Sequence, residues 1–181
     1  RNLGVLKDIL LPLCVDGKNI DYDECIRDNM SASLLRRMPS VFAKGGSVTA
    51  GNTCLKHDGA AVVLLASAAA VKRYGLKPVG KIVQSAIAGC DPNWFPLSPV
   101  PSIRALLKKA QLTLADIAAL EINEAFAVKI LTCCRELGYS LDKTNILGGA
   151  LSYGHPCGAS GAIMLLHLLK ALEQMDGRFG V

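Results

Sequence analysis

Short runs of apolar residues alternate with helical patterns from residue 58 onward, and glycine or proline marks most of the boundaries. Four runs have the length and apolar content of buried strands: 60–65, 79–88, 117–122 and 144–147. Four further segments have the spacing of helices: 67–74, 101–110, 124–137 and 159–172. Strands that alternate with helices predict an α/β domain with a largely parallel sheet.

The first 52 residues have a different pattern, with more turn signals and less apolar sequence. A short strand or helix is expected at 5–13, a turn at 16–19 and a short helix at 31–37. None of these elements builds a core by itself. The sequence therefore predicts two parts, a loop-rich region at 1–52 and an α/β domain at 53–181.

The composition and charge of the chain indicate which kinds of molecule it is suited to bind. Hydrophobic residues make up 51% of the chain and aromatic residues 5%, which predicts an aliphatic, alanine-rich core. The net charge of +5 comes from scattered lysines and arginines, so a nucleic-acid partner is not indicated. A basic surface suits an anionic small molecule.

The seven cysteines form no CxxC pair and no metal-ligand spacing, so no metal site is expected. A reducing, intracellular compartment, with the cytoplasm as first choice, is the simplest account of so many unpaired thiols. No signal segment is recognised, and the apolar runs are shorter than the ~20 residues that a membrane helix requires. A soluble protein without a membrane partner is expected.

A glycine-rich stretch at 148–161 leads into the last helical pattern and carries His155. It could be a plain strand-to-helix turn in which His155 satisfies local hydrogen bonds. A phosphate loop is less well supported, because no Gly-Lys-Ser/Thr follows. The third interpretation is a rigidly held catalytic imidazole, since histidine exchanges protons near neutral pH.

Three motifs together resemble the thiolase family of acetyl-CoA acetyltransferases and 3-ketoacyl-CoA thiolases. They are Gly154-His155-Pro156, Asn123-Glu124-Ala125-Phe126, and Val48-Thr49-Ala50-Gly51-Asn52 with 58–61 after it. The resemblance implies the C-terminal half of a layered αβαβα fold without its last strands, preceded by part of a loop domain. It also implies that the helix at 159–172 is buried between two sheets.

The resemblance assigns the chemistry to two residues. His155 would activate a nucleophilic cysteine and donate to one oxyanion, and Asn123 would hold a water at that oxyanion site. The alternative for Asn123 is a helix cap, which its position also permits. The family's two catalytic cysteines have no counterpart here, so the chain is expected to be inactive alone. Cys157 and the other cysteines are interpreted as structural thiols.

Contacts with coenzyme A are implied at five positions. Arg27 matches an arginine near the adenine, Phe42 and Ala50 match positions along the pantetheine tunnel, and Phe126 faces the acyl end. Cys54 stands where the family has serine. Leu55 replaces the family glycine after it, and these two departures weaken the case for a hydroxyl hydrogen bond to pantetheine.

The resulting hypothesis is an acyltransferase that condenses or thiolytically cleaves acyl-CoA, with coenzyme A as substrate or product and no tightly bound cofactor. A ketoacyl synthase is disfavoured because that class has histidine in place of Asn123. The alternative is a noncatalytic acyl-CoA or lipid-binding protein of the same fold. The expected partners are an acyl-CoA, the missing N-terminal thiolase half, and a second copy that covers the apolar helix at 162–172.

Overall fold

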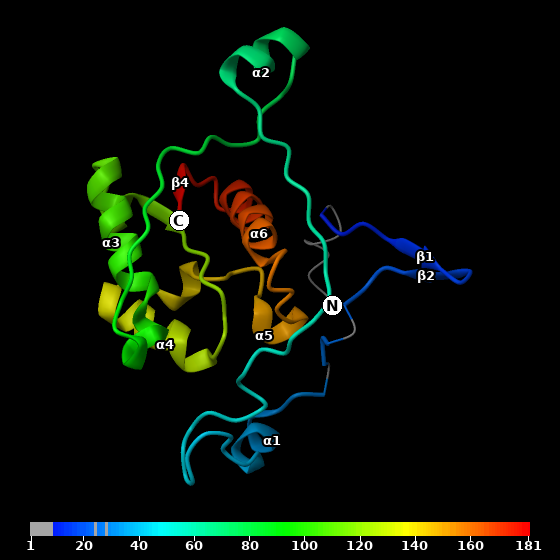
Figure 1. Cartoon of the computed structure of the whole chain (residues 1–181), viewed down its shortest axis with the longest axis vertical. Helices are drawn as coiled ribbons and strands as arrows, with labels where there is room; N and C mark the ends of the chain where they lie inside the picture. Colours follow the sequence, from blue (N-terminus) through cyan, green and yellow to red (C-terminus); the bar gives the residue numbers. More distant parts are fainter. Residues whose placement is uncertain (1–8, 24, 28) are drawn as a thin grey trace.

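The computed structural model describes residues 9–181 except Glu24 and Asp28. Helix α6 lies at the centre, with α3 and α4 on one side and the β1–β2 hairpin on the other (Figure 1). The elements are β1 Leu13–Val15, β2 Lys18–Ile20, α1 Ala32–Arg37, α2 Ala68–Tyr74, η2 Pro92–Leu97, α3 Pro99–Ala110, η3 Leu114–Asp116, β3 Ile117–Ala119, α4 Ala127–Leu137, η4 Leu141–Lys143, α5 Ala150–Tyr153, α6 Ser160–Gln174 and β4 Phe179–Gly180.

The N-terminal part holds a hairpin and a short helix. Strands β1 and β2 pair antiparallel around Asp16 and Gly17, whose φ angles of 50° and 76° are those of a tight hairpin turn. Helix α1 begins after Ser31, whose hydroxyl accepts a hydrogen bond from the Leu34 amide. The predicted turn and the helix at 31–37 are confirmed. Of the element expected at 5–13, residues 5–8 lie outside the described residues, and residues 9–12 form no helix or strand.

A small parallel sheet forms the centre of the α/β part. Strand β3 pairs parallel with β4, and Leu120 continues the chain into a parallel bridge with Thr144. The predicted strand at 117–122 is thus confirmed in its first half. The strand expected at 144–147 is reduced to that single bridge.

Helices pack on both faces of this sheet. One core cluster joins Ile117, Leu120 and Ile122 to α3 and α4, and a second joins Ala119 and Leu147 to Ala171 of α6. The helices expected at 67–74, 101–110, 124–137 and 159–172 are all present: their first residues differ from the prediction by one to three positions, and only the last helix has a different end, two residues later. The α/β prediction is correct.

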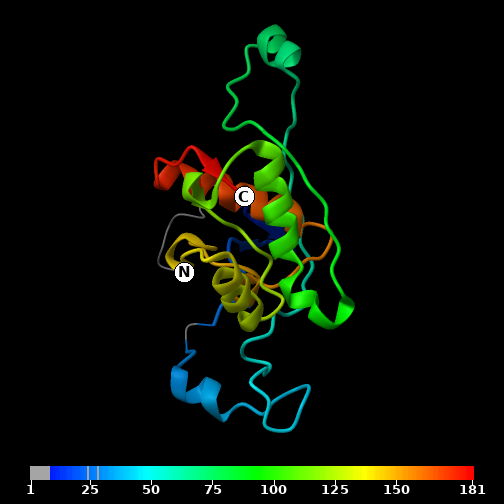
Figure 2. The same cartoon turned by 90° about the vertical axis from the view of Figure 1, so that its left-hand side faces the viewer.

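Two predicted strands are wrong. Residues 59–67 and 76–90 have no regular structure; they form the two sides of a long arm that carries α2 at its tip (Figures 1 and 2). Val62 is 88% exposed and Ile87 is fully exposed. A strand needs a neighbour that completes its hydrogen bonds, and no strand in the described part of the chain pairs with either segment.

Helix α6 is less buried than the sequence predicts. Only Ser160, His167 and Ala171 are buried, and its large apolar side chains are all half-buried. The β3–β4 sheet covers one side of the helix, and no second sheet covers the other in the described residues. The expected association with a second copy stays a prediction. Within the described residues, no helix combines the length and apolar character needed to span a bilayer.

Candidate functional site

The segment at 52–56 joins the regions around residues 123–127 and His155. On one side, the Cys54 amide donates to the Ala125 carbonyl at 3.1 Å. On the other, the His155 amide donates to the Leu55 carbonyl at 2.7 Å. The three sequence motifs, which are far apart along the chain, therefore meet in one place.

Asn123 lies just beyond residues 117–122, of which 117–119 form strand β3 and Leu120 forms the bridge to Thr144. Helix α4 begins only at Ala127 with Phe126 as its N-cap, so Asn123 is not the cap of this helix. Its Nδ2 instead lies 2.9 Å from Nδ1 of His155. Both side chains are half-buried, so each retains some contact with solvent.

His155 receives two contacts on the same ring nitrogen. Nδ1 also lies 2.7 Å from Oγ of Ser160, which donates to the Pro156 carbonyl at 3.0 Å. An amide nitrogen only donates, so the Asn123 contact requires an Nδ1 without a proton. The Ser160 contact suits an Nδ1–H donor, because the hydroxyl proton is already used. Only this second tautomer leaves Nε2 free to accept a proton.

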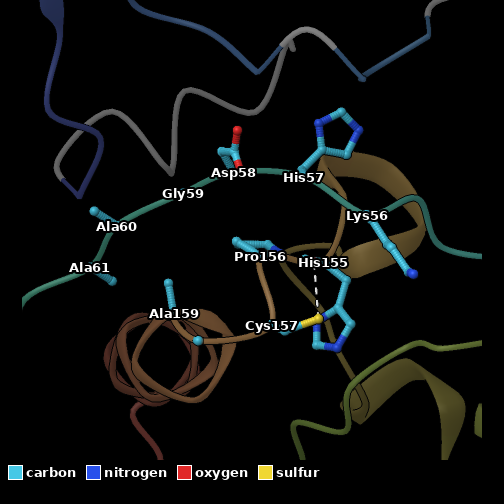
Figure 3. Close-up of a pocket in the computed structure, with 11 residues that line it drawn as sticks. Lys56, His57, Asp58, Gly59, Ala60, Ala61, His155, Pro156, Cys157 and Ala159 are labelled. Atoms are coloured by element: carbon cyan, nitrogen blue, oxygen red, sulfur yellow. Dashed lines mark hydrogen bonds between the residues drawn. The ribbon is translucent and has the colours of Figure 1, made fainter.

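An open pocket of about 540 Å³ lies beside His155 and is lined by residues 56–61 and 155–159. In Figure 3 the segment 56–61 runs past the loop 155–159, and the Pro156 side chain points toward that segment while Cys157 lies beside the His155 ring. The Cys157 thiol donates weakly to the His155 carbonyl, with Sγ and O 3.8 Å apart. The pocket thus gives a small molecule access to the loop that carries His155.

A buried acid lies under this site. Glu121 is 8% exposed, and its Oε1 has no hydrogen-bond partner among the described residues. Burial, and then the nearby charge of Glu124, raises the pKa of Glu121 to about 8. The carboxyl group is therefore protonated at neutral pH.

This pKa predicts how stability depends on pH. The folded state holds a proton on Glu121 between its usual pKa of 4.5 and about 8, so stability falls as the pH rises through this window. Glu121→Gln cannot ionise, and it should be more stable than the wild type at pH 9 by on the order of a few kcal/mol. At pH 5 the two proteins should unfold at similar urea concentrations. Equal urea midpoints at pH 9, with the exposed Glu136→Gln as control, would disprove the assignment.

Comparisons with known proteins agree with this geometry. The model of the thiolase C-terminal domain matches residues 76–181, and that of the thiolase N-terminal domain matches residues 2–69. This chain belongs to the thiolase family. It therefore belongs to a family of acyltransferases.

Individual relatives match along nearly all of the chain. Human mitochondrial 3-ketoacyl-CoA thiolase is 40% identical, and the match covers 100% of this chain and 47% of the human protein. An acetyl-CoA acetyltransferase of Synechocystis is 46% identical, and the match covers 88% of this chain and 40% of that protein. The crystal structure of the human enzyme in complex with CoA has a TM-score of 0.88 at 36% identity, covering 98% of this chain and 45% of that one. Acetyl-CoA acetyltransferase of Bacillus anthracis has a TM-score of 0.90 at 35% identity, covering 98% and 46%. The chain has a thiolase fold and spans about half the length of these relatives.

The expected coenzyme A residues of this thiolase chain are only partly brought together. Phe42 packs edge-on against Phe126, with ring centroids 5.7 Å apart, although 73% of Phe42 is exposed. Cys54 is half-buried, and its amide donates to the carbonyl of Ala125, the residue before Phe126. Arg27 and Ala50 are exposed. The roles of all five in binding stay predictions, as does the domain boundary between residues 52 and 53.

The seven cysteines differ in their surroundings: Cys133 and Cys134 are buried, whereas Cys14, Cys90 and Cys157 are exposed. All seven lie among the described residues, and none forms a disulfide there. Their interpretation as structural thiols stays a prediction. Burial raises the pKa of Cys133 to about 11 and also raises that of Cys54. No group of histidine, cysteine and acidic side chains in the described residues could hold a metal ion.

Sequence reasoning missed three residues that shape this thiolase site. They are Glu124, Asn145 and Ser160, which hold the segments around Asn123 and His155. Glu124 lies inside a recognised motif, so its position was a usable signal. Asn145 and Ser160 lie outside the recognised motifs, and no sequence pattern marked them, because their contacts form only when the strand, the loop and α6 pack together.

Proposed function

We propose that this chain supplies the acid–base half of an acyl-CoA acyltransferase site. The observation that carries the proposal is the meeting of Asn123 and His155, whose side chains come from different motifs and lie 2.9 Å apart beside an open pocket. In the tautomer whose Nδ1–H donates to Ser160, Nε2 is free to accept a proton and the Asn123 amide does not donate to the ring, so its donor is available to an oxyanion. Thioester chemistry needs these two groups next to a thiol.

The proposed steps conserve protons and charge. His155 takes the thiol proton of a cysteine outside this chain at Nε2, and the thiolate attacks the acyl carbonyl to form a protein thioester. Asn123 donates through a bound water to the carbonyl oxygen as that oxygen gains negative charge. The imidazolium then returns its proton to the departing group, and the thiol of coenzyme A removes the acyl group in the second half-reaction.

These steps describe cleavage of a 3-ketoacyl-CoA, in which the departing group is the enolate of acetyl-CoA. Condensation of two acetyl-CoA molecules is the reverse reaction, and it needs another base, outside this chain, that removes a proton from the α-carbon of the second acetyl-CoA. The substrate class is an acyl-CoA, in keeping with the names of the relatives. The nucleophile belongs to the half of the relatives that this chain does not span. An intracellular compartment is part of the same proposal, and the relatives include an enzyme named as mitochondrial.

A turnover assay tests this function. A polypeptide of the relatives' full length that carries this chain should convert acetoacetyl-CoA and coenzyme A into acetyl-CoA, and the 181-residue chain alone should not. The rival is a noncatalytic acyl-CoA-binding protein. Tight binding of acyl-CoA by the full-length polypeptide without any turnover would favour that rival.

A further inference from the structure

The Glu124 carboxylate connects the two segments that carry Asn123 and His155. Its Oε1 accepts a hydrogen bond from Nδ2 of Asn145 at 2.9 Å, and its Oε2 accepts one from the Leu151 amide at 3.0 Å. Glu124 directly follows Asn123, while Leu151 lies in α5, four residues before His155. One side chain thus spans the gap between the end of the strand and the catalytic loop.

Asn145 makes two further hydrogen bonds, both to the backbone of Ile122, that join the same two segments. Its Oδ1 accepts from the Ile122 amide and its Nδ2 donates to the Ile122 carbonyl, both at 2.8 Å. The Asn145 residue is 8% exposed, so these bonds are shielded from water. Buried donors and acceptors are costly to leave unpaired, so the hydrogen bonds of Asn145 and Glu124 resist breaking. They therefore hold residues 145–151 against the segment 120–123.

Gly149 leaves space for the carboxylate. A Cβ at this position would overlap the carboxyl carbon and both oxygens of Glu124. The φ angle of Gly149 is −154°, an extended conformation that any residue adopts. The absence of a side chain at Gly149 is therefore explained by the nearby carboxylate and not by the backbone conformation.

We infer that Glu124 is a positioning residue for acyl transfer, whose carboxylate sets the distance between the Asn123 amide and the His155 imidazole. Two donors from two different segments converge on it, and each needs an acceptor. A carboxylate offers two acceptor oxygens, whereas glutamine offers one acceptor and one donor and would lose one of the bonds. This inference rests on the proposed function, since the distance matters only if the two groups act on one substrate.

The kinetic test uses the full-length polypeptide that carries this chain. Glu124→Gln should lower kcat by about 10-fold and leave KM for acetoacetyl-CoA nearly unchanged, because a small misplacement of catalytic groups slows the chemical step. Glu124→Asp keeps both acceptor oxygens and should recover part of the loss. Glu136→Gln is the matched control on the exposed side of α4 and should behave as the wild type.

A double-mutant cycle separates positioning from general destabilisation. Gly149→Ala should lower kcat by about 10-fold alone, because its methyl group displaces the carboxylate. In the Glu124→Ala background the overlap is gone, so Gly149→Ala should add almost nothing. A full additional loss in that background, or a Glu124→Gln variant with wild-type kcat, would overturn the inference. If Glu124→Ala does not fold, the cycle is run on Glu124→Asp, whose shorter side chain relieves part of the overlap.

A measurement without turnover keeps this inference separate from the proposed function. The chain has three histidines, so the ring signals of His155 can be followed by NMR. Glu124→Gln should shift the His155 signals, while Glu136→Gln should not. If the wild type shows no acyltransferase activity, the proposed function fails and the His155 signals still decide whether Glu124 positions the ring. Unchanged signals would refute the positioning role.

Discussion

Replacing His155 with alanine should lower the rate of thiolysis by at least about 100-fold in a full-length polypeptide that carries this chain. The imidazole is the group in the site that can both accept the thiol proton and return it. In the tautomer with a free Nε2, the Nδ1–H donates to Oγ of Ser160 and orients the ring, so His155→Ala removes the proton acceptor at Nε2. The measurement is kcat for acetoacetyl-CoA cleavage at saturating coenzyme A.

Two variants serve as controls for this effect. His57→Ala changes a half-buried histidine on the other wall of the pocket and should leave kcat within a few-fold of the wild type. His155→Gln keeps a polar side chain of similar reach but supplies no base, and it should be as slow as His155→Ala. Cleavage by His155→Ala near the wild-type rate would refute the assigned role.

Asn123→Asp should reduce turnover severely while the melting temperature stays near that of the wild type. The substitution keeps the size of the side chain but removes the amide donor and places a negative charge where an oxyanion develops. Loss of one such donor costs about 100-fold to 1,000-fold in kcat. Since Phe126 and not Asn123 is the N-cap of α4, no large loss of helix stability is expected.

The opposite pattern would assign Asn123 a structural role. In that case Asn123→Asp would unfold at a much lower temperature, while the fraction that remains folded would turn over normally. Asn93→Asp, at an exposed position in η2, is a matched control for the same change in charge. It should alter neither the melting temperature nor kcat.

Local patterns predicted the helices of this chain well. Helix α2 begins after Ser67, whose hydroxyl caps it, and is followed by Gly75 in the left-handed conformation, so it differs from the predicted range 67–74 by one residue at its start. The glycine loop before α6 and the position of His155 were also evident from the sequence. These features depend on residues close together in the chain.

The strands predicted at 60–65 and 79–88 are absent, because a strand depends on residues that are far away in the chain. Val62, Val79 and Ile87 have the β-branched character of strand residues, but pairing depends on a distant partner that no local pattern reveals. The same limit applies to the site. His155 and Asn123 were recognised by their motifs, whereas the Glu124–Asn145 bond emerged only when segments 21 residues apart were packed together.

The central claim is that this chain provides the imidazole and the amide while another part of the protein provides the nucleophile. Peptide mapping by mass spectrometry after brief mixing of the full-length polypeptide with acetyl-CoA tests it most directly. The acetyl thioester should map to a cysteine outside this segment, and all seven cysteines of the segment should stay unmodified. An acetyl thioester on Cys157, or on any other cysteine of these 181 residues, would contradict the account.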